Sequence, residues 1–454
     1  MRKSRPDLLH GPIVRPILYF FFPILIGTFF QQLYNTVDAV VVGNFVGKEA
    51  LGAVGGTTGT MINLLVGFVT GLSSGATVVV SQYYGSGDTK GVRRAVSSAM
   101  FLAVSLGALL TVGGIALTPT LLRMMNVPDS VFPLSVRYMQ IFLAGMIPSM
   151  IYNNGAGGLR AVGDSRRPLY FLIISCFTNI VLDIVCVAYL GMGVEGAALA
   201  TILSQAVSCV LTLCVLGRSY EAYRFRLKDL RFDRDILSRI VVIGLPTGIQ
   251  SCLYSVSNLF IQRSVNGYGV DTMAAYTAFG KIDALFWTTS GAFGTSVLTF
   301  SGQNFGAGNI ERVRKGFRVS LLLDLLISGV LAVFMYFGGP YLYPLFTSDP
   351  EVIRIGVEIL RYLCPYWVTF IFVEVFSSGL RSCGDSLTTM LITAAGIAVF
   401  RIAWIILVPA SSIFDTLRCY PLSWVITGAL FLAYYLQGGW LKRSLAARAK
   451  LMHN

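Results

Sequence analysis

Long apolar runs separated by short polar stretches make up most of this chain. A helix that crosses a bilayer needs about 20 mainly apolar residues, and twelve runs reach that length between turn signals. The runs cover residues 15–43, 51–80, 93–118, 132–154, 168–190, 194–217, 237–265, 274–300, 316–338, 354–379, 388–409 and 420–441. The pattern predicts an all-α integral membrane protein with twelve transmembrane helices.

The two halves of the chain repeat one another. The matching positions are Pro23 and Asn35 with Pro246 and Asn258, and the GLRxxGDS turns at 158–165 and 379–386. Each half holds an even number of spans, so both copies have the same orientation, as in a parallel repeat about an axis along the membrane normal. We predict two pseudo-symmetric six-helix bundles, with the N-lobe at 1–217 and the C-lobe at 240–454. Substrate should bind between them.

The longest polar stretch, residues 218–239, lies between the sixth and seventh spans. We predict a cytoplasmic inter-lobe linker here. A short interfacial helix within it would place its arginines against anionic lipid head groups. The GLRxxGDS turns lack P-loop spacing, so we interpret them as helix ends in which Gly stops one helix, Arg satisfies its last carbonyls and Asp caps the next.

The first span carries polar residues that are costly inside a membrane. Gln31, Tyr34, Asn35 and Asp38 fall at i, i+3, i+4 and i+7 and therefore share one helical face. A carboxylate near the centre of a span costs at least roughly 2.5 kcal/mol. This face must therefore look into the protein or into water.

A second polar group lies in the fifth and sixth spans. Asn179 and Asp183 are spaced i, i+4, and Thr201 follows in the next span. If these three converge on Asp38, the site offers hard oxygen ligands suited to Na⁺ and equally able to hold a proton. Two carboxylates in a low dielectric cannot both ionise easily unless a cation lies between them. The alternative is a neutral polar cluster that holds helices together.

Composition and charge support this class of protein. Of the 454 residues, 55% are hydrophobic and 13% charged, and the mean hydropathy is +0.70. The net charge of +13 would suit nucleic-acid binding, but the basic residues gather in loops that alternate with loops poor in Lys and Arg. Under the positive-inside rule, this alternation places both termini in the cytoplasm and makes the number of spans even. We expect the protein in the cell membrane. We expect no cleaved signal peptide.

The eight cysteines lie mostly in apolar runs without CxxC spacing, and His10 and His453 lie near the termini. We therefore expect neither a disulfide framework nor a Cys or His metal site. Lys281 in the eighth span either faces the cleft, where it would pair with an anionic substrate group or with Glu374, or reaches the outer interface with its stem in lipid. Arg401 in the eleventh span has the same two interpretations and no named partner.

Several motifs together resemble the MATE family of multidrug and toxic-compound extrusion transporters. They are QxxYNxxD at 31–38, QxxGxG at 82–87, GLRxxGDS at 158–165, N-x3-D at 179–183 and the six-plus-six repeat. The resemblance covers nearly the whole chain and implies the V-shaped MATE fold. It is closest to the prokaryotic branch named for a DNA-damage-inducible member. Other branches carry an essential glutamate eight residues after the proline of the seventh span, whereas this chain has Tyr254.

In that branch the N-lobe binds the coupling cation. The resemblance therefore implies that the cation or proton ligands, with Na⁺ as the possible metal, are Asp38, Asn179, Asp183 and Thr201. We expect the substrate site to be lined by Gln31, Tyr34, Asn35, Asn153, Asn154, Lys281 and Glu374, and the first helix to bend near Pro23. The expected function is secondary active antiport that exports amphipathic, often cationic, organic compounds in exchange for H⁺ or Na⁺.

Two alternatives stay open: a flippase for lipid-linked oligosaccharide, which should concentrate Arg or Lys in the cleft, and an exporter of an endogenous metabolite. We expect no enzymatic activity, because no nucleophile with a base is visible. We also expect no cofactor beyond the coupling ion and no nucleotide or nucleic-acid partner. The partners should be a small-molecule organic substrate and membrane lipids, and the protein should be a monomer.

Overall fold

The computed structural model describes residues 7–219 and 221–452. Within these residues the regular structure is helical, with no strand. The basic residues at 1–6 and His453, which entered the sequence analysis, lie outside the described residues. The described chain forms two compact units, one made of residues 7 and 22–248 and the other of residues 8–21 and 249–452. The predicted lobes 1–217 and 240–454 stay a prediction. The two units differ from them because the start of the first long helix, residues 14–21, belongs to the second unit, and residues 240–248 belong to the first.

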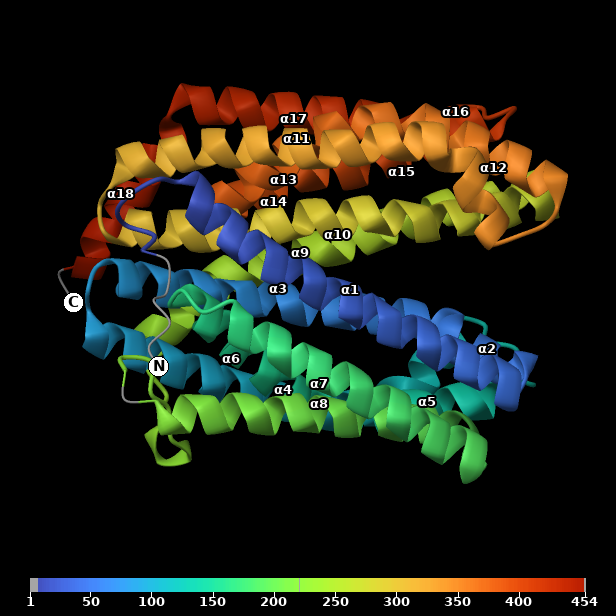
Figure 1. The fold of residues 1–454 in the computed structure, drawn as a ribbon, viewed down its shortest axis with the longest axis horizontal. Helices are drawn as coiled ribbons and strands as arrows, with labels where there is room; N and C mark the ends of the chain where they lie inside the picture. Colours follow the sequence, from blue (N-terminus) through green and yellow to red (C-terminus); the bar gives the residue numbers. More distant parts are fainter. Residues whose placement is uncertain (1–6, 220, 453–454) are drawn as a thin grey trace. The chain divides into compact units, whose positions relative to one another are not determined.

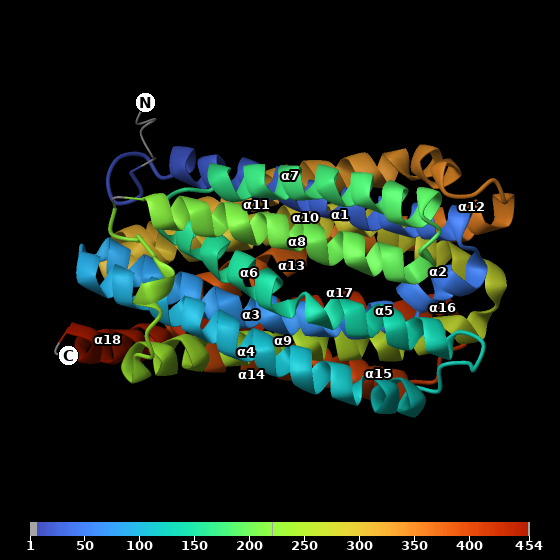
Figure 2. The ribbon, with the colours of Figure 1, turned by 90° about the horizontal axis from the view of Figure 1, so that it is seen from below.

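The first unit contains most of α1 and the helices up to the start of α9 (Figure 1). Their bounds are α1 Val14–Phe45, α2 Lys48–Gly55, α3 Thr57–Gly85, α4 Thr89–Met124, α5 Phe132–Ala144, α6 Met146–Ala161, α7 Arg166–Asp183, a π-helix Ile184–Tyr189, α8 Gly193–Arg218 and α9 Arg234–Val265. α7 and α8 lie side by side in both views (Figures 1 and 2). Between α8 and α9, the described linker residues 219 and 221–233 form one 3-10 turn, Leu227–Asp229, and no interfacial helix.

The second unit contains the start of α1, the end of α9 and the remaining helices. Their bounds are α10 Val270–Gly306, α11 Ile310–Leu342, α12 Pro350–Leu363, α13 Trp367–Ser382, α14 Ser386–Thr393, a π-helix Ala394–Val399, α15 Phe400–Leu407, α16 Ile413–Leu417, α17 Cys419–Gln437 and α18 Gly439–Met452, with 3-10 turns at Asn266–Tyr268, Tyr343–Leu345 and Cys364–Tyr366. α10, α11 and α13 pack against one another. Aromatic rings fill this core: Phe286 stacks on Trp367 with ring centroids 4.7 Å apart, and Trp287 meets Phe370 edge-on at 4.5 Å.

Ten continuous helical stretches of the described residues, several of which join consecutive elements such as α14 and α15, are long and apolar enough to cross a membrane, and α5 with α6 makes an eleventh candidate. That predicted span, 132–154, is not one straight helix, because α5 and α6 meet at Gly145 with a bend of 47°. Pro148 lacks the N–H that would bond the carbonyl of Ala144, which weakens the helix at this point. The predicted span 274–300 lies inside α10, which has 37 residues but is not among the candidates, since Thr, Ser and Gly lower its hydropathy.

α1 and α9 each belong to both units. The boundary in α1 lies between Phe21 and Phe22, next to Pro23, and the boundary in α9 follows Gly248, two residues after Pro246. Both helices continue through their prolines. Because proline has no N–H, each helix lacks one backbone hydrogen bond at this point and bends there at lower cost. The conformational role of Pro23 stays a prediction.

Glycines bring α3 and the first half of α9 into close contact within the first unit. Both helices carry a G-x-x-x-G pair, Gly71 with Gly75 and Gly244 with Gly248. A methyl group on Gly75 would lie 2.4 Å from the carbonyl oxygen of Ile240, and one on Gly71 would lie 2.6 Å from the Cα of Gly248. Small residues at such spacing allow helix backbones to meet in membranes.

The two GLRxxGDS turns end helices, as predicted, but differ in detail. Gly163 and Gly384 have φ of 96° and 92°, a conformation that favours glycine. Asp164 caps α7 by accepting the backbone N–H of Arg167 at 3.1 Å, whereas Asp385 accepts a hydrogen bond from the Tyr434 hydroxyl. The second copy thus holds α17 in place rather than capping α14.

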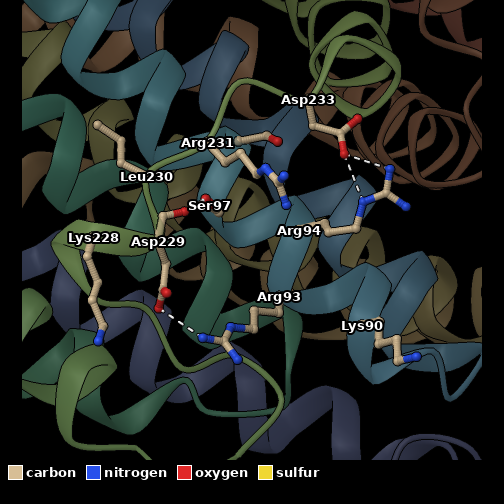
Figure 3. Close-up of a pocket in the computed structure, with 10 residues that line it drawn as sticks. Lys90, Arg93, Arg94, Ser97, Lys228, Asp229, Leu230, Arg231 and Asp233 are labelled. Carbon is tan, nitrogen blue, oxygen red and sulfur yellow. Dashed lines mark hydrogen bonds and ion pairs between the residues drawn. The ribbon is translucent and has the colours of Figure 1, made fainter.

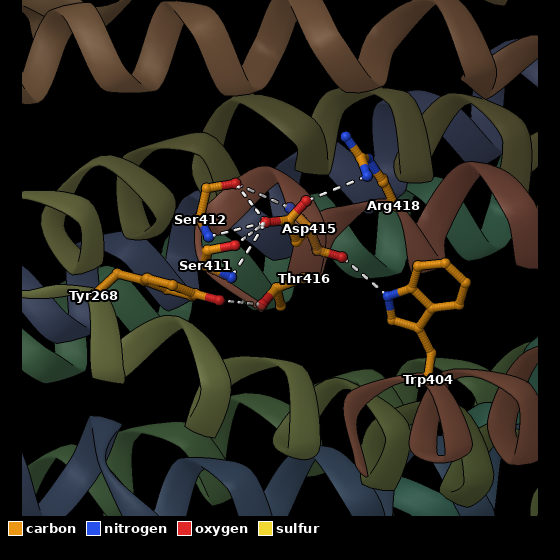
Figure 4. Close-up of polar contacts among 7 residues, drawn as sticks. All are labelled: Tyr268, Trp404, Ser411, Ser412, Asp415, Thr416 and Arg418. Carbon is orange, nitrogen blue, oxygen red and sulfur yellow. Dashed lines mark hydrogen bonds and ion pairs between the residues drawn. The ribbon is translucent and has the colours of Figure 1, made fainter. Parts of the chain in front are cut away.

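Polar contacts fix the start of α16 in the second unit (Figure 4). Ser412 Oγ accepts the N–H of Asp415 at 3.3 Å, and Asp415 Oδ2 accepts the N–H of Ser412 at 3.0 Å, which forms a capping box. Trp404 Nε1 donates to the carbonyl of Asp415 at 2.9 Å, and Arg418 pairs with the Asp415 carboxylate at 3.2 Å. These contacts tie the last turn of α15 to the start of α16.

Candidate functional site

The four predicted coupling residues are all buried in the first unit. Asp38 lies in α1, Asn179 and Asp183 in α7, and Thr201 in α8. Their relative exposures are 8%, 1%, 0% and 6%. The two aspartates are close enough to interact electrostatically. The structure therefore places two acids from separate spans in one buried region.

The apolar neighbours of these residues form one core cluster. Val41 lies near Asp38 in α1, Val187 follows Asp183 in the chain, and Ala197 lies one turn before Thr201 in α8. α7 and α8 pack along one another, which brings Asn179 and Asp183 to the same helix pair as Thr201. A shared apolar wall lowers the local dielectric and strengthens interactions between charges.

Most polar atoms of this group have no hydrogen-bond partner among the described residues. They are Asp38 Oδ1, both side-chain atoms of Asn179 and both carboxylate oxygens of Asp183. Buried polar groups are nearly always paired, and an unpaired one costs about 1–3 kcal/mol, more when it is charged. The group is thus a set of free oxygen donors in an apolar wall, and its chemistry fits a bound proton or Na⁺.

Thr201 fits the same donor set. Its hydroxyl donates to the carbonyl of Ala197 at 3.1 Å, within its own helix. A hydroxyl oxygen that donates one hydrogen bond still has lone pairs that can bind a cation. The roles of these four residues stay predictions.

A π-helix begins directly after Asp183 and runs from Ile184 to Tyr189. Short π segments within α-helices are rare and occur frequently at functional sites. The sequence gives no sign of this feature, because nothing in an apolar run separates π from α geometry. The helix thus changes from α to π geometry directly after Asp183, whose side chain is fully buried.

Tyr138 also belongs to this region and was missed. It lies in α5 with 4% exposure, within electrostatic range of Asp38, Tyr34 and Asp183. A phenol has an O–H that can donate to a carboxylate. In the sequence, Tyr138 differs from its apolar neighbours only by its hydroxyl. Tyrosines of this kind are common in membrane helices and therefore do not indicate a site.

The predicted substrate residues of the N-lobe fall into two groups. Gln31 and Tyr34 are half-buried and approach each other on α1, while Asn35 is exposed. Asn153 and Asn154 lie in α6 and donate to carbonyls of their own helix, those of Ser149 and Met150, at 2.9 and 3.0 Å. Asn154 also donates to Ser73 Oγ at 3.2 Å and is buried. Asn154 thus also holds α6 to α3.

Lys281 and Glu374 do not pair in this structure. Lys281 is exposed, and Glu374 accepts a hydrogen bond from Ser378 Oγ at 3.1 Å and lies within electrostatic range of Arg381 and Tyr254. Pairing of Lys281 with Glu374 is absent here, and the two interpretations of Lys281 stay predictions. Glu374 belongs to a half-buried polar group in α13.

Arg401 is the centre of a second buried polar cluster, in the second unit. Its guanidinium donates to Ser423 Oγ at 2.9 Å and to Asn258 Oδ1 at 3.4 Å, and lies 4.3 Å from the ring centroid of Tyr420. Its Nη2 has no partner among the described residues, and Asp283 is within electrostatic range without forming an ion pair. This residue, which had no named partner in the sequence analysis, is a buried cation held by neutral groups.

Comparison with known proteins agrees with this architecture. The MatE family model matches residues 23–185 and 246–407, one segment in each half of the chain. The chain belongs to the MatE family. The two matched segments follow the predicted duplication, and together they contain the two prolines, Asp38, Asn179, Asp183, Glu374 and Arg401, whereas Thr201 lies between them.

Several MatE relatives are similar over nearly the full length. The probable multidrug resistance protein YpnP of Bacillus subtilis is 28% identical, with 87% of this chain and 88% of the relative covered. The FAD transporter of Shewanella oneidensis is 24% identical, with 96% of each chain covered. A solved structure described as MATE in the bent conformation has a TM-score of 0.88 at 24% identity and covers 96% of this chain and 98% of its own. That likeness shows the fold, and the predicted DNA-damage-inducible branch stays a prediction.

Proposed function

We propose that this protein is a secondary active antiporter of the cell membrane that exports amphipathic organic compounds in exchange for H⁺ or Na⁺. The observation that carries the proposal is the buried group of Asp38, Asn179 and Asp183, whose oxygens lack partners. A structural polar cluster would satisfy its own hydrogen bonds, and this one does not. The names of the multidrug resistance relatives support a drug-like substrate. The many apolar helices and the distribution of basic loops support a multi-pass protein with cytoplasmic termini.

The proposed cycle follows from the charges. With neither a proton nor a cation bound, Asp38 and Asp183 place two negative charges in one apolar region, which is unfavourable. Protonation, or arrival of Na⁺ from outside, relieves that repulsion and lets the helices α1 and α7 approach. α1 passes into the second unit next to Pro23, so a movement of Asp38 acts on a helix that bends there at low cost. Substrate release on ion binding then completes the exchange.

The energy available is sufficient for export. One charge that moves through 100 mV supplies about 2.3 kcal/mol. Each 1.4 kcal/mol changes an equilibrium about tenfold, so one such ion per substrate concentrates the substrate several tens of fold. We propose that this gradient is the only energy source, with no catalysis by the protein and with a monomer as the working unit.

The test uses purified protein in vesicles and a fluorescent cationic dye, under an imposed pH gradient and then under a Na⁺ gradient. Asp38→Asn and Asp183→Asn should each abolish gradient-driven dye movement while the protein stays folded. Asp324→Asn is the matched control, because Asp324 is equally buried but accepts hydrogen bonds from Ser290 at 3.1 Å and Ser328 at 2.6 Å. Dye transport that survives in both N-lobe variants would refute the coupling site.

A second candidate is export of an endogenous anionic metabolite. It is favoured by the buried Arg401, which has a free N–H and no carboxylate partner, and by the relative named as an FAD transporter. Arginine binds carboxylate and phosphate groups through paired N–H donors. The same vesicles loaded with FAD distinguish the candidates: gradient-driven FAD movement without dye movement supports the metabolite exporter.

A further inference from the structure

A pocket of about 440 Å³ lies beside the N-terminal turns of α4 in the first unit (Figure 3). One wall comes from α4 and the other from the linker that follows α8. The lining residues are Lys90, Arg93, Arg94, Ser97 and Ser98 of α4 and Lys228, Asp229, Leu230, Arg231 and Asp233 of the linker. This side of the membrane is the one predicted to be cytoplasmic. The pocket shares no residue with the coupling site.

Two ion pairs build the pocket. Arg93 pairs with Asp229 at 3.1 Å, and Arg94 pairs with Asp233 at 2.6 Å, as Figure 3 shows. Ser97 Oγ also donates to the carbonyl of Asp229. These contacts fasten the linker to α4 and neutralise both acids of the pocket.

Three cations of the pocket are left over. The side chains of Lys90, Lys228 and Arg231 form no hydrogen bond or ion pair with any of residues 7–219 and 221–452. Five cations against two carboxylates give the pocket a net charge of +3. Such a concentration of one sign of charge in a concave wall attracts counter-ions.

A buried hydroxyl also faces this pocket. Ser98 lines it with 1% exposure, and its Oγ has no hydrogen-bond partner among the described residues. A serine in a helix commonly donates to a carbonyl three or four residues before it, as Thr118 does in this same α4. Ser98 is thus an unused donor at the base of a cationic pocket.

The duplicated half lacks this arrangement. At the offset of 221 that relates the GLRxxGDS turns, Lys90 corresponds to Glu311 and Ser98 corresponds to Val319. Glu311 pairs with Lys315 at 2.7 Å, so the corresponding helix end carries a self-neutralised pair. The lysine at position 90 and the serine at position 98 are therefore features of the N-terminal half that the corresponding helix end does not share.

We propose that this pocket binds a phosphate-bearing anion, with Lys90, Lys228 and Arg231 supplying positive charge and Ser98 supplying a hydroxyl donor. Phosphate fits because its oxygens accept several charge-assisted hydrogen bonds at once. The phosphate has two possible sources, the head group of an anionic phospholipid and a soluble phosphate compound. The bound anion would hold the linker on α4 more firmly than the two ion pairs do alone.

The test is native mass spectrometry and binding titration of the full-length protein in detergent. The probes are phosphatidylglycerol, phosphatidylcholine as the zwitterionic reference, and ATP. Binding of phosphatidylglycerol over phosphatidylcholine identifies the lipid source, and binding of ATP that excludes phosphatidylglycerol identifies the soluble source. Either result supports the pocket only if the variants below weaken it.

The double variant Lys90→Gln with Arg231→Gln should weaken binding at least about tenfold, and Ser98→Ala, which adds no bulk, should weaken it several-fold. The matched control removes two exposed charges from the corresponding helix of the second half, Arg314→Gln with Arg318→Gln, and should leave binding unchanged. The proposal would be overturned if the control variant and the pocket variant lose the same amount of binding. It would also be overturned if the protein binds neither phosphatidylglycerol nor ATP more tightly than phosphatidylcholine.

Discussion

Replacing Gly75 with alanine would place a methyl group against the backbone of α9. That carbon would lie 2.4 Å from the carbonyl oxygen of Ile240 and 2.6 Å from the backbone nitrogen of Gly244. Ordinary contact begins at 3.4 Å, so the helices must separate by about 1 Å. Both obstacles are backbone atoms, which no rotamer change can move.

The expected cost is about 1–3 kcal/mol, the usual penalty for overpacking a close contact. Gly113→Ala in α4 is the matched control, because a methyl group there meets nothing within 4 Å. Both changes gain the same helix propensity, so the difference between them isolates the clash. Gly244→Ala, at 2.4 Å from the carbonyl oxygen of Leu72, should match Gly75→Ala. Gly248→Ala should cost less, because its nearest obstacles, the ring and the carbonyl oxygen of Phe68, both lie farther away, at 2.9 Å.

The measurement is the free energy of unfolding from SDS titration in mixed micelles, with the four variants compared in one series. The predicted order of stability is Gly113→Ala highest, Gly248→Ala next, and Gly75→Ala with Gly244→Ala lowest. If Gly75→Ala is as stable as Gly113→Ala, the close crossing of α3 and α9 is wrong.

Two further predictions concern buried and surface charges. Arg401→Gln should abolish transport of an anionic substrate in vesicles and leave cationic dye transport intact, because it removes the guanidinium that would bind an anionic group. Equal loss of both activities would assign Arg401 a purely structural role. Burial is the largest single influence on the pKa of Asp229 and Asp233 and raises it, but the hydrogen bonds and charges of Arg93 and Arg94, together with backbone N–H donors, outweigh burial in sum, so both pKa values lie below the ordinary 3.8. The stability that a depressed pKa contributes is present above the unfolded pKa and is lost only as pH falls through the folded one. Hydrogen exchange of residues 226–234, corrected for its intrinsic rate, should therefore be unchanged between pH 7 and pH 5 and should increase only below the ordinary carboxyl range; loosening already at pH 5 would contradict this.

The fold was largely predictable because lipid permits few alternatives. A backbone inside a bilayer must satisfy its own hydrogen bonds, so apolar runs of sufficient length indicate helices. The exceptions have local causes. Gly145 and Pro148 break one predicted span into α5 and α6, and the Thr, Ser and Gly content of α10 lowers its hydropathy.

The candidate site was predictable for the same reason, but only in part. A carboxylate in mid-span is costly, so Asp38 and Asp183 stood out from the sequence. Tyr138 did not, since a tyrosine in an apolar run carries no such cost. Arg401 stood out as well, but its partners Asn258 and Ser423 lie in other helices, and no spacing along the chain relates them.

The sequence by itself determined the membrane class, the duplication and the charged residues that need an explanation, because each follows from the cost of placing a group in hydrocarbon. Only the tertiary structure decided which of these groups meet. The free oxygens of Asp183, the unused hydroxyl of Ser98 and the contact between Gly75 and α9 depend on which helix faces have been packed together. That choice is made by side-chain packing between segments far apart in the chain, which periodicity within one segment does not encode.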